Sequence, residues 1–210
     1  LKSLNISKHD FQDGNFPRIF SEKIKEADSP DLEKDMKPES IYFLSFNYTP
    51  TILKYRTLTK SYNDKLRYNF IHGELDNPRN PIVFGFGDEF DNDFKEFEAL
   101  DNNELFRHIK SFKYSQTPNY HNLLRFIEAD RFQVYVMGHS CGISDRTMLR
   151  EIFEHDNCTS IKIFYHEISK DSNDFLEKVY DISRHFTDNG VMRRKLVPFE
   201  NSRPMPQPRV

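Results

Sequence analysis

Residues Arg131–Leu149 read RFQVYVMGHSCGISDRTML, and this stretch decides which fold the sequence can adopt. The apolar run Phe132–Met137 has the length and composition of a buried β-strand, and it stops abruptly at Gly138. A helix-forming segment begins near Ser144. Strand, glycine turn and helix in this order form the building unit of α/β folds, whose ligands bind at the carboxyl ends of parallel strands.

The rest of the chain repeats this alternation. We expect further strands at residues 41–46, 66–71, 81–84, 161–165 and 191–197, and helices after Pro50 and at residues 94–112, 118–128, 144–155 and 172–186. Strands that alternate with helices predict a mostly parallel sheet covered on both faces. The fold class predicted is therefore α/β, a Rossmann-like three-layer sandwich.

The chain divides into three segments by composition. Residues 1–38 are polar and weakly periodic, and we interpret them as loop with a short helix. Residues 39–198 carry the strand and helix alternation and form the α/β domain. Residues 199–210 form a proline-rich tail, which we expect to be extended and exposed.

Composition excludes several classes of function. The formal net charge is only −3, so no electrostatic footprint for nucleic acid is visible. No apolar stretch is long enough to span a membrane, and no secretion signal is recognisable. Cys141 and Cys158 are the two cysteines, and no His/Cys spacing predicts a metal site. We therefore expect a cytoplasmic protein that binds no metal.

The glycine turn after the 132–137 strand allows two interpretations. Residues 138–142 read GHSCG, a formal match to the G-x-S-x-G turn of α/β serine hydrolases. In that case Ser140 is the nucleophile, and Asp171 and His185 could complete a triad. The same geometry also holds nucleotides against a helix N-terminus, and the turn would then be one wall of a nucleotide pocket.

Polar groups follow three of the predicted strands. Asn47 and Thr49 come after the first strand, His72 and Gly73 after the second, and the turn from Gly138 to Asp145 after a later one. If these strands are parallel, their carboxyl ends lie along the same edge of the sheet. We therefore expect the three groups to converge on one site.

Four short motifs in this order carry a resemblance to a known family. They are Phe46-Asn47-Tyr48-Thr49, Ile71-His72-Gly73, Ile82-Val83-Phe84-Gly85, and Gly138-His139-Ser140 with Ser144-Asp145. Together they resemble the bacteriophage abortive-infection protein family AbiH, which is related to sirtuin-like domains. The resemblance runs from about Ile41 to Tyr165.

The resemblance implies a bacterial anti-phage defence protein with a sirtuin-like nucleotide pocket. Members of that fold bind NAD, and bacterial defence members cleave its nicotinamide–ribose bond, so the resemblance implies NAD glycohydrolase activity. By motif position, the catalytic pair would be His72 and Asn47. A further set would line the nucleotide: Gly73, Gly138, Ser140, Asp145 and Thr49.

One departure from the family pattern motivates a third hypothesis. AbiH proteins usually open with a glycine-containing G-N-G-F-D-type turn, and residues 1–40 contain only an isolated Gly14. We expect either a chain that starts inside the family's full length, since its first residue is Leu, or an N-terminus that has diverged. A chain with half of a dinucleotide site could instead be a silent sensor or scaffold, which acts as a homo-oligomer or with a defence partner.

Overall fold

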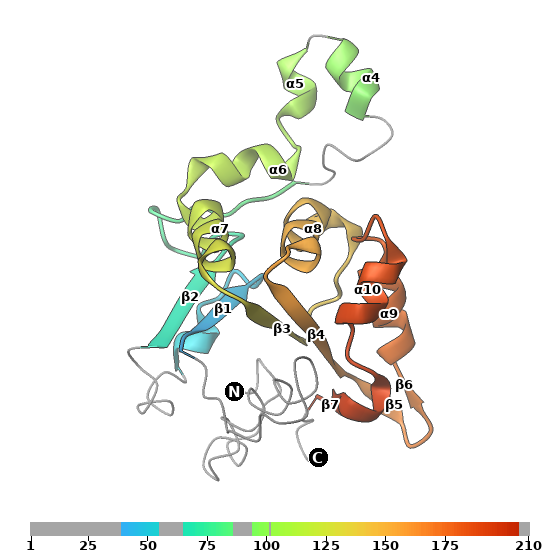
Figure 1. The fold of residues 1–210 in the computed structure, drawn as a ribbon. Helices are drawn as coiled ribbons and strands as arrows, with labels where there is room; N and C mark the ends of the chain where they lie inside the picture. The colour runs from blue at the N-terminus through green and yellow to red at the C-terminus, as the bar shows by residue number, and fades with distance from the viewer. Residues whose placement is uncertain (1–38, 55–64, 86–93, 101, 206–210) are drawn as a thin grey trace.

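A computed structural model describes residues 39–54, 65–85, 94–100 and 102–205 (Figure 1). The predicted loop and short helix of residues 1–38 lie outside the described residues. Of the helix predicted after Pro50, the described part is a single 3₁₀ turn at residues 51–54.

Two parallel strands come first in the described chain. β1 (Ile41–Ser45) and β2 (Leu66–Phe70) pair in parallel with Ile41 opposite Leu66 and Ser45 opposite Phe70. Both strands therefore point their carboxyl ends in the same direction. The residues that follow them, Phe46 and His72, stand at one edge of this sheet, with their ring centroids 5.2 Å apart.

A second parallel sheet has three strands in the order β3-β4-β7. β3 (Phe132–Met137) pairs with β4 (Cys158–Tyr165), and β4 pairs at its carboxyl end with β7 (Arg203–Pro204). A short antiparallel hairpin of β5 (Glu167–Ser169) and β6 (Ser172–Asn173) follows β4. β4 is buried along almost its whole length, because helices cover it and its neighbours pair on both sides.

Four helices pack against these strands. α7 (Asn119–Ala129) lies on β2, whereas α8 (Arg146–Glu154), α9 (Phe175–Ser183) and α10 (Asn189–Lys195) lie on β4 (Figure 1). α7, α8 and α9 each present an apolar stripe at helical spacing to the sheets, and that of α8 contains Met148, Leu149, Ile152 and Phe153. α10 contributes the buried side chain of Met192. One hydrophobic core joins both sheets, because side chains of β1 pack against the same buried cluster as Val136 of β3.

The segment predicted as one helix at 94–112 is three short helices. They are α4 (Phe94–Ala99), α5 (Asn103–Phe106) and α6 (Lys110–Lys113), followed by the 3₁₀ turn η3 (Tyr114–Gln116). Asn102 is the N-cap residue of α5, because its side chain accepts a hydrogen bond from the Glu104 amide. Ile109 is extended and ends that turn before α6. In Figure 1, α4 and α5 project away from the sheets.

Two predicted strands are wrong. Residues 81–84 form no ladder with any strand of the described residues, although the Val83 amide donates to the His72 carbonyl at 2.9 Å. Residues 191–197 contain most of α10 instead of a strand. Asp188 caps that helix through the Gly190 amide, and Met192 turns into the core. The helix expected from residue 172 begins only at Phe175, because β6 takes the first two positions.

The proline-rich tail is more ordered than the sequence suggests. β7 extends the sheet, and the Met205 amide donates to the Tyr165 carbonyl at 2.6 Å. Ser202 and Met205 are buried, so within the described residues the expectation of an exposed tail is wrong at these two positions. The remaining residues of the tail, 206–210, lie outside the described residues.

The predicted α/β class with parallel strands is confirmed. The described ladders are a two-stranded and a three-stranded parallel sheet, which are smaller than the single broad sheet of a Rossmann-like sandwich. Within the described residues, every helix is too short or too polar to cross a membrane.

Candidate functional site

Four side chains form a buried polar group, here called the Asp145 cluster: Asp145, Lys110, His72 and His139. Lys110 Nζ donates to Asp145 Oδ1 at 2.6 Å, and His72 Nε2 lies 3.0 Å from the same oxygen. His139 Nε2 lies 3.5 Å from the second oxygen, Oδ2. The side chains of Asp145 and Lys110 are each 9% exposed, so the carboxylate meets its partners largely away from water.

Asp145 lies in the unit formed by β3, the glycine turn after it and α8. It ends the 3₁₀ turn η4 (Ile143–Asp145) and is the N-cap residue of α8. Its side chain makes no capping hydrogen bond and turns instead toward the three basic side chains. A carboxylate at this helix start also gains from the positive end of the helix dipole.

The partners of Asp145 decide its ionisation. Burial by itself raises the pKa of this carboxyl, because the charged form loses its hydration. Hydrogen bonding with His139, His72 and Lys110, together with the Lys110 charge, outweighs burial and lowers the pKa far below its usual value. Asp145 is therefore a carboxylate at any physiological pH and fixes a negative charge inside the cluster.

His72 is held by the turn that follows β2. Gly73 adopts φ +84°, and a Cβ there would lie 2.2 Å from the Pro81 carbonyl oxygen, so only glycine fits. This close approach lets the Val83 amide reach the His72 carbonyl. His72 Nε2 is buried and lies 3.0 Å from Asp145 Oδ1, so the two side chains are in direct polar contact away from water.

His139 is orientated from its other side. Its Nδ1 accepts a hydrogen bond from the Cys141 amide at 3.0 Å, so the neutral ring carries its proton on Nε2, facing Asp145. The Phe46 ring packs on His139 with a centroid separation of 3.9 Å. Tyr48 and Tyr114 lie around His72, each with its ring centroid 6.4 Å away. Aromatic side chains from the end of β1 and from η3 thus enclose both histidines.

The turn between Gly138 and Gly142 is unusual at Cys141. This residue has φ +56°, a conformation that L-residues other than Asn and Asp rarely adopt. Its carbonyl oxygen lies 2.7 Å from His185 Nε2. Burial raises the pKa of the Cys141 thiol to about 12, so it stays protonated and is no nucleophile at neutral pH.

The residues predicted to hold a nucleotide lie around this cluster, and several are exposed. Asn47 and Thr49 are exposed after β1, and Thr49 Oγ1 accepts from Thr51 Oγ1 at 3.0 Å. Gly138 is exposed with φ +71°, and Ser140 is exposed two residues later. The three strand ends therefore do meet through Phe46, His72 and His139. Asn47 itself makes no side-chain hydrogen bond to another described residue.

The three residues of the serine-hydrolase alternative, Ser140, Asp171 and His185, make no described contact with one another. Ser140 Oγ accepts from the Gly142 amide at 3.3 Å, which is a local turn contact. His185 Nε2 forms a hydrogen bond with the Cys141 carbonyl oxygen, and Asp171 is exposed in the β5–β6 hairpin. Within the described residues, Ser140 therefore has no histidine base.

Lys110 is the site residue that the sequence does not reveal. It belongs to a charged stretch that reads as a solvated helix face, yet it is buried and contacts Asp145. His139 stands in the predicted turn, but its contact with Asp145 depends on the fold of that turn. A lysine just after the apolar residue Ile109, at the start of a helix, is the weak signal that could have pointed to Lys110.

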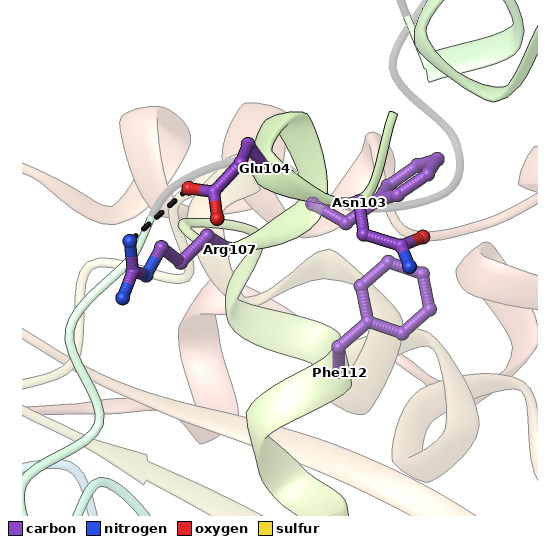
Figure 2. Close-up of a pocket in the computed structure, with 5 residues that line it drawn as sticks. Asn103, Glu104, Arg107 and Phe112 are labelled. Atoms are coloured by element: carbon purple, nitrogen blue, oxygen red, sulfur yellow. Dashed lines mark hydrogen bonds and ion pairs between the residues drawn. The ribbon is translucent and has the colours of Figure 1, made fainter. Parts of the chain in front are cut away.

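An open hollow on the described surface lies away from the Asp145 cluster. Figure 2 shows an open hollow of about 430 Å³ between α5 and α6, lined by Asn103, Glu104, Phe106, Arg107 and Phe112. The Glu104–Arg107 ion pair at its wall spans 3.1 Å between exposed side chains. No residue of the Asp145 cluster lines this hollow, so the chemistry and the hollow are separate features.

Comparisons with known proteins address the family. No curated protein and no solved structure matches the chain. The family model described as "Bacteriophage abortive infection AbiH" matches residues 6–167. This range includes both parallel strand pairs β1–β2 and β3–β4 and the whole Asp145 cluster. It ends two residues after Tyr165, where the resemblance seen in the sequence ends, and it begins well before Ile41. The chain belongs to the AbiH family of bacteriophage abortive-infection proteins.

Proposed function

We propose that this AbiH protein acts in abortive infection by hydrolysing the nicotinamide–ribose bond of NAD, with His72 as the general base. The observation that carries the proposal is the pairing of His72, just after β2, with the buried carboxylate of Asp145 at the start of α8, whose Oδ1 lies 3.0 Å from His72 Nε2. A carboxylate that faces one nitrogen of a histidine fixes its orientation and stabilises its protonated form.

The position of the cluster in the fold supports a nucleotide as ligand. His72 follows β2, His139 and Asp145 follow β3, and Phe46 follows β1. Open α/β sheets bind nucleotides at the carboxyl ends of their strands. In the proposal, the two described parallel sheets belong to one Rossmann-like, sirtuin-like sheet. Gly138, exposed and without a side chain, lets the backbone approach a phosphate or ribose.

The proposed reaction balances without a metal or a second cofactor. The bond between ribose C1′ and the nicotinamide nitrogen breaks, and its electron pair leaves with neutral nicotinamide. A water molecule attacks the oxocarbenium-like carbon, and His72 Nδ1 accepts the proton that the water loses. His72 Nε2 faces Asp145 throughout, so the imidazolium forms beside a fixed negative charge. The products are ADP-ribose, nicotinamide and one proton.

The remaining predicted residues have binding roles in this proposal. Asn47 orientates the attacking water through its exposed amide. Thr49 and Ser140 offer exposed hydroxyls, and Gly73 and Gly138 allow close backbone approach. Asp145 holds His72 rather than contacting the ribose. NAD is thus the substrate, and its recognition rests on polar side chains from three loops.

The test is release of nicotinamide from NAD by the purified chain. We expect His72→Ala to abolish release and Asn47→Ala to reduce it, by about 100-fold and about 10-fold respectively. His121→Ala is the matched control, because His121 is an exposed histidine on α7 outside the cluster. Wild-type protein that neither binds nor cleaves NAD would overturn the proposal. Equal rates for the His72 and His121 variants would remove His72 from the chemistry.

A catalytically silent sensor or scaffold is the second candidate. It is favoured by the burial of the Asp145 cluster, whose side chains already pair with one another. Lys110 already neutralises Asp145, and the side chain of His72 is only 5% exposed. A cluster of this kind can serve as a polar element that specifies the fold. Under this hypothesis, His72→Ala lowers stability while NAD binds neither variant nor wild type.

A further inference from the structure

Residues beyond the matched family region contact the glycine turn at two places. The family match ends at residue 167, whereas His185 and Met205 come later in the chain. His185 follows α9, and Met205 follows β7. Both are buried, and both meet residues of the turn between Gly138 and Gly142.

His185 holds the turn through the Cys141 peptide. Its Nε2 lies 2.7 Å from the Cys141 carbonyl oxygen, and the side chain is almost fully buried. The amide of the same residue donates to His139 Nδ1 at 3.0 Å. Cys141 therefore links His185 to His139, in a left-handed backbone conformation that is costly without such a contact.

The contact fixes the protonation state of His185. A carbonyl oxygen only accepts, so Nε2 carries the proton and donates it. Nδ1 is then unprotonated, and it is buried with no partner among the described residues. Burial lowers the pKa of His185, and Arg146 and His139 act in the same direction, against the Cys141 carbonyl and Asp145. The neutral ring with its proton on Nε2 is the form that fits.

Met205 supports the turn from a second side. The Met205 amide donates to the Tyr165 carbonyl at the end of β4. Its terminal methyl lies 3.9 Å from the position that a Cβ on Gly138 would take. The C-terminal part of the chain thus lies against the start of the turn, while His185 holds its middle.

We propose that His185 is a positioning residue, which holds the Cys141 peptide in its left-handed conformation and thereby sets His139 and Asp145 in the cluster. The segment that follows the family match would then be required for the geometry of the site. The consequence for catalysis rests on the proposed NAD hydrolysis, but the geometric claim does not, so the two can fail separately.

The experiment uses ¹⁵N NMR of the histidine rings and ¹³C NMR of the Asp145 carboxyl in the full chain. His185→Leu removes the donor, and His185→Gln keeps an N–H near the same position. In the leucine variant we expect the hydrogen bond at His139 Nδ1 to be lost and the pKa of Asp145 to rise. The glutamine variant should restore both signals. Ile182→Ala is the matched control, because the Ile182 side chain is fully buried on α9 in the same core but, being apolar, offers no hydrogen bond to the turn.

The outcomes separate positioning from general packing. If Ile182→Ala shifts His139 and Asp145 as much as His185→Leu does, the role is packing and the proposal is wrong. A wild-type spectrum that shows the proton of His185 on Nδ1 would also overturn it, even where the variants fail to fold. If the signals respond as expected but NAD is not cleaved, the positioning role stands and the proposed function fails.

Discussion

Lys110 Nζ donates to Asp145 Oδ1 across 2.6 Å, although the two residues are 35 positions apart and both are buried. The bond ties α6 to the start of α8. It also places the charge of Lys110 directly beside the carboxylate. The charge balance of the cluster therefore depends on a residue from the helix next to the projecting α4–α5 segment.

Replacing Lys110 with methionine should destabilise the protein strongly. The substitution keeps the length of the side chain but leaves a buried carboxylate with only histidine partners, at a cost of about 3 kcal/mol. Urea unfolding at neutral pH measures the loss. The double variant Lys110→Met/Asp145→Asn should recover most of it, because no buried charge remains. A double variant as unstable as Lys110→Met would contradict this account.

Asp145 should make stability fall in acid. Its pKa in the folded state is lowered from the model-peptide value of 3.8, so the carboxylate contributes stability that is complete above that value. As the pH falls below it, the unfolded chain takes up the proton first and the contribution is progressively lost. We expect Asp145→Asn to cost about 2 kcal/mol at neutral pH and progressively less in acid. Unfolding free energies measured from neutral to acidic pH test this, and parallel curves would contradict it.

His185 should impose a second pH dependence at higher pH. Burial lowers its pKa in the folded state below the usual value of 6.5, so the neutral ring contributes stability that is complete above that pH. The contribution is lost as the pH falls through 6.5 toward the folded-state pKa. Arg146 and His139 oppose a charge there, and Asp145 favours it. The wild type should lose more stability than His185→Gln across this range, as followed by thermal unfolding; equal losses would argue against it.

Gly73→Ala should disrupt the turn that carries His72. An added Cβ would meet the Pro81 carbonyl oxygen at 2.2 Å, and φ is +84°, so both space and backbone oppose it. We expect a loss of more than about 2 kcal/mol. Gly142→Ala is the control, because its Cβ would meet only Ser140 Oγ, at 3.4 Å, and should change stability by less than about 1 kcal/mol. Denaturant unfolding compares the two, and similar losses would show that the close approach at Pro81 relaxes.

Periodicity and glycine placement predicted the elements that carry the site. The strand at 132–137 has the predicted bounds, and α7 and α8 agree with the predicted helices to within a few residues. These elements have long apolar stripes and clear start and stop signals, so local sequence dominates. The convergence of His72 and the 138–145 turn followed from strand direction alone, because parallel strands share one edge.

Contacts between distant segments could not be predicted in this way. Lys110 has the local sequence of a solvated helix, and only the packing of α6 buries it against Asp145. Residues 191–197 contain enough apolar side chains for a strand, but the Asp188 cap starts a helix. Likewise, the resemblance implies a nucleotide-lining role for Asp145, and nothing in the local sequence indicates its contacts with other side chains. Its side chain contacts His72 and Lys110, which are distant from it in the sequence, and His139, which belongs to the preceding turn.

β4 has consequences for synthesis on the ribosome. It is the most buried of the described strands, and among the described residues its outer edge pairs with Arg203–Pro204 and, through one bridge, with Leu196, about 30 to 40 residues later. Until those residues leave the exit tunnel, an apolar strand stands with one edge open to any other chain. A nascent or truncated chain that stops near residue 167 should therefore aggregate, and chaperones that cover open sheet edges should associate with this protein late in its translation.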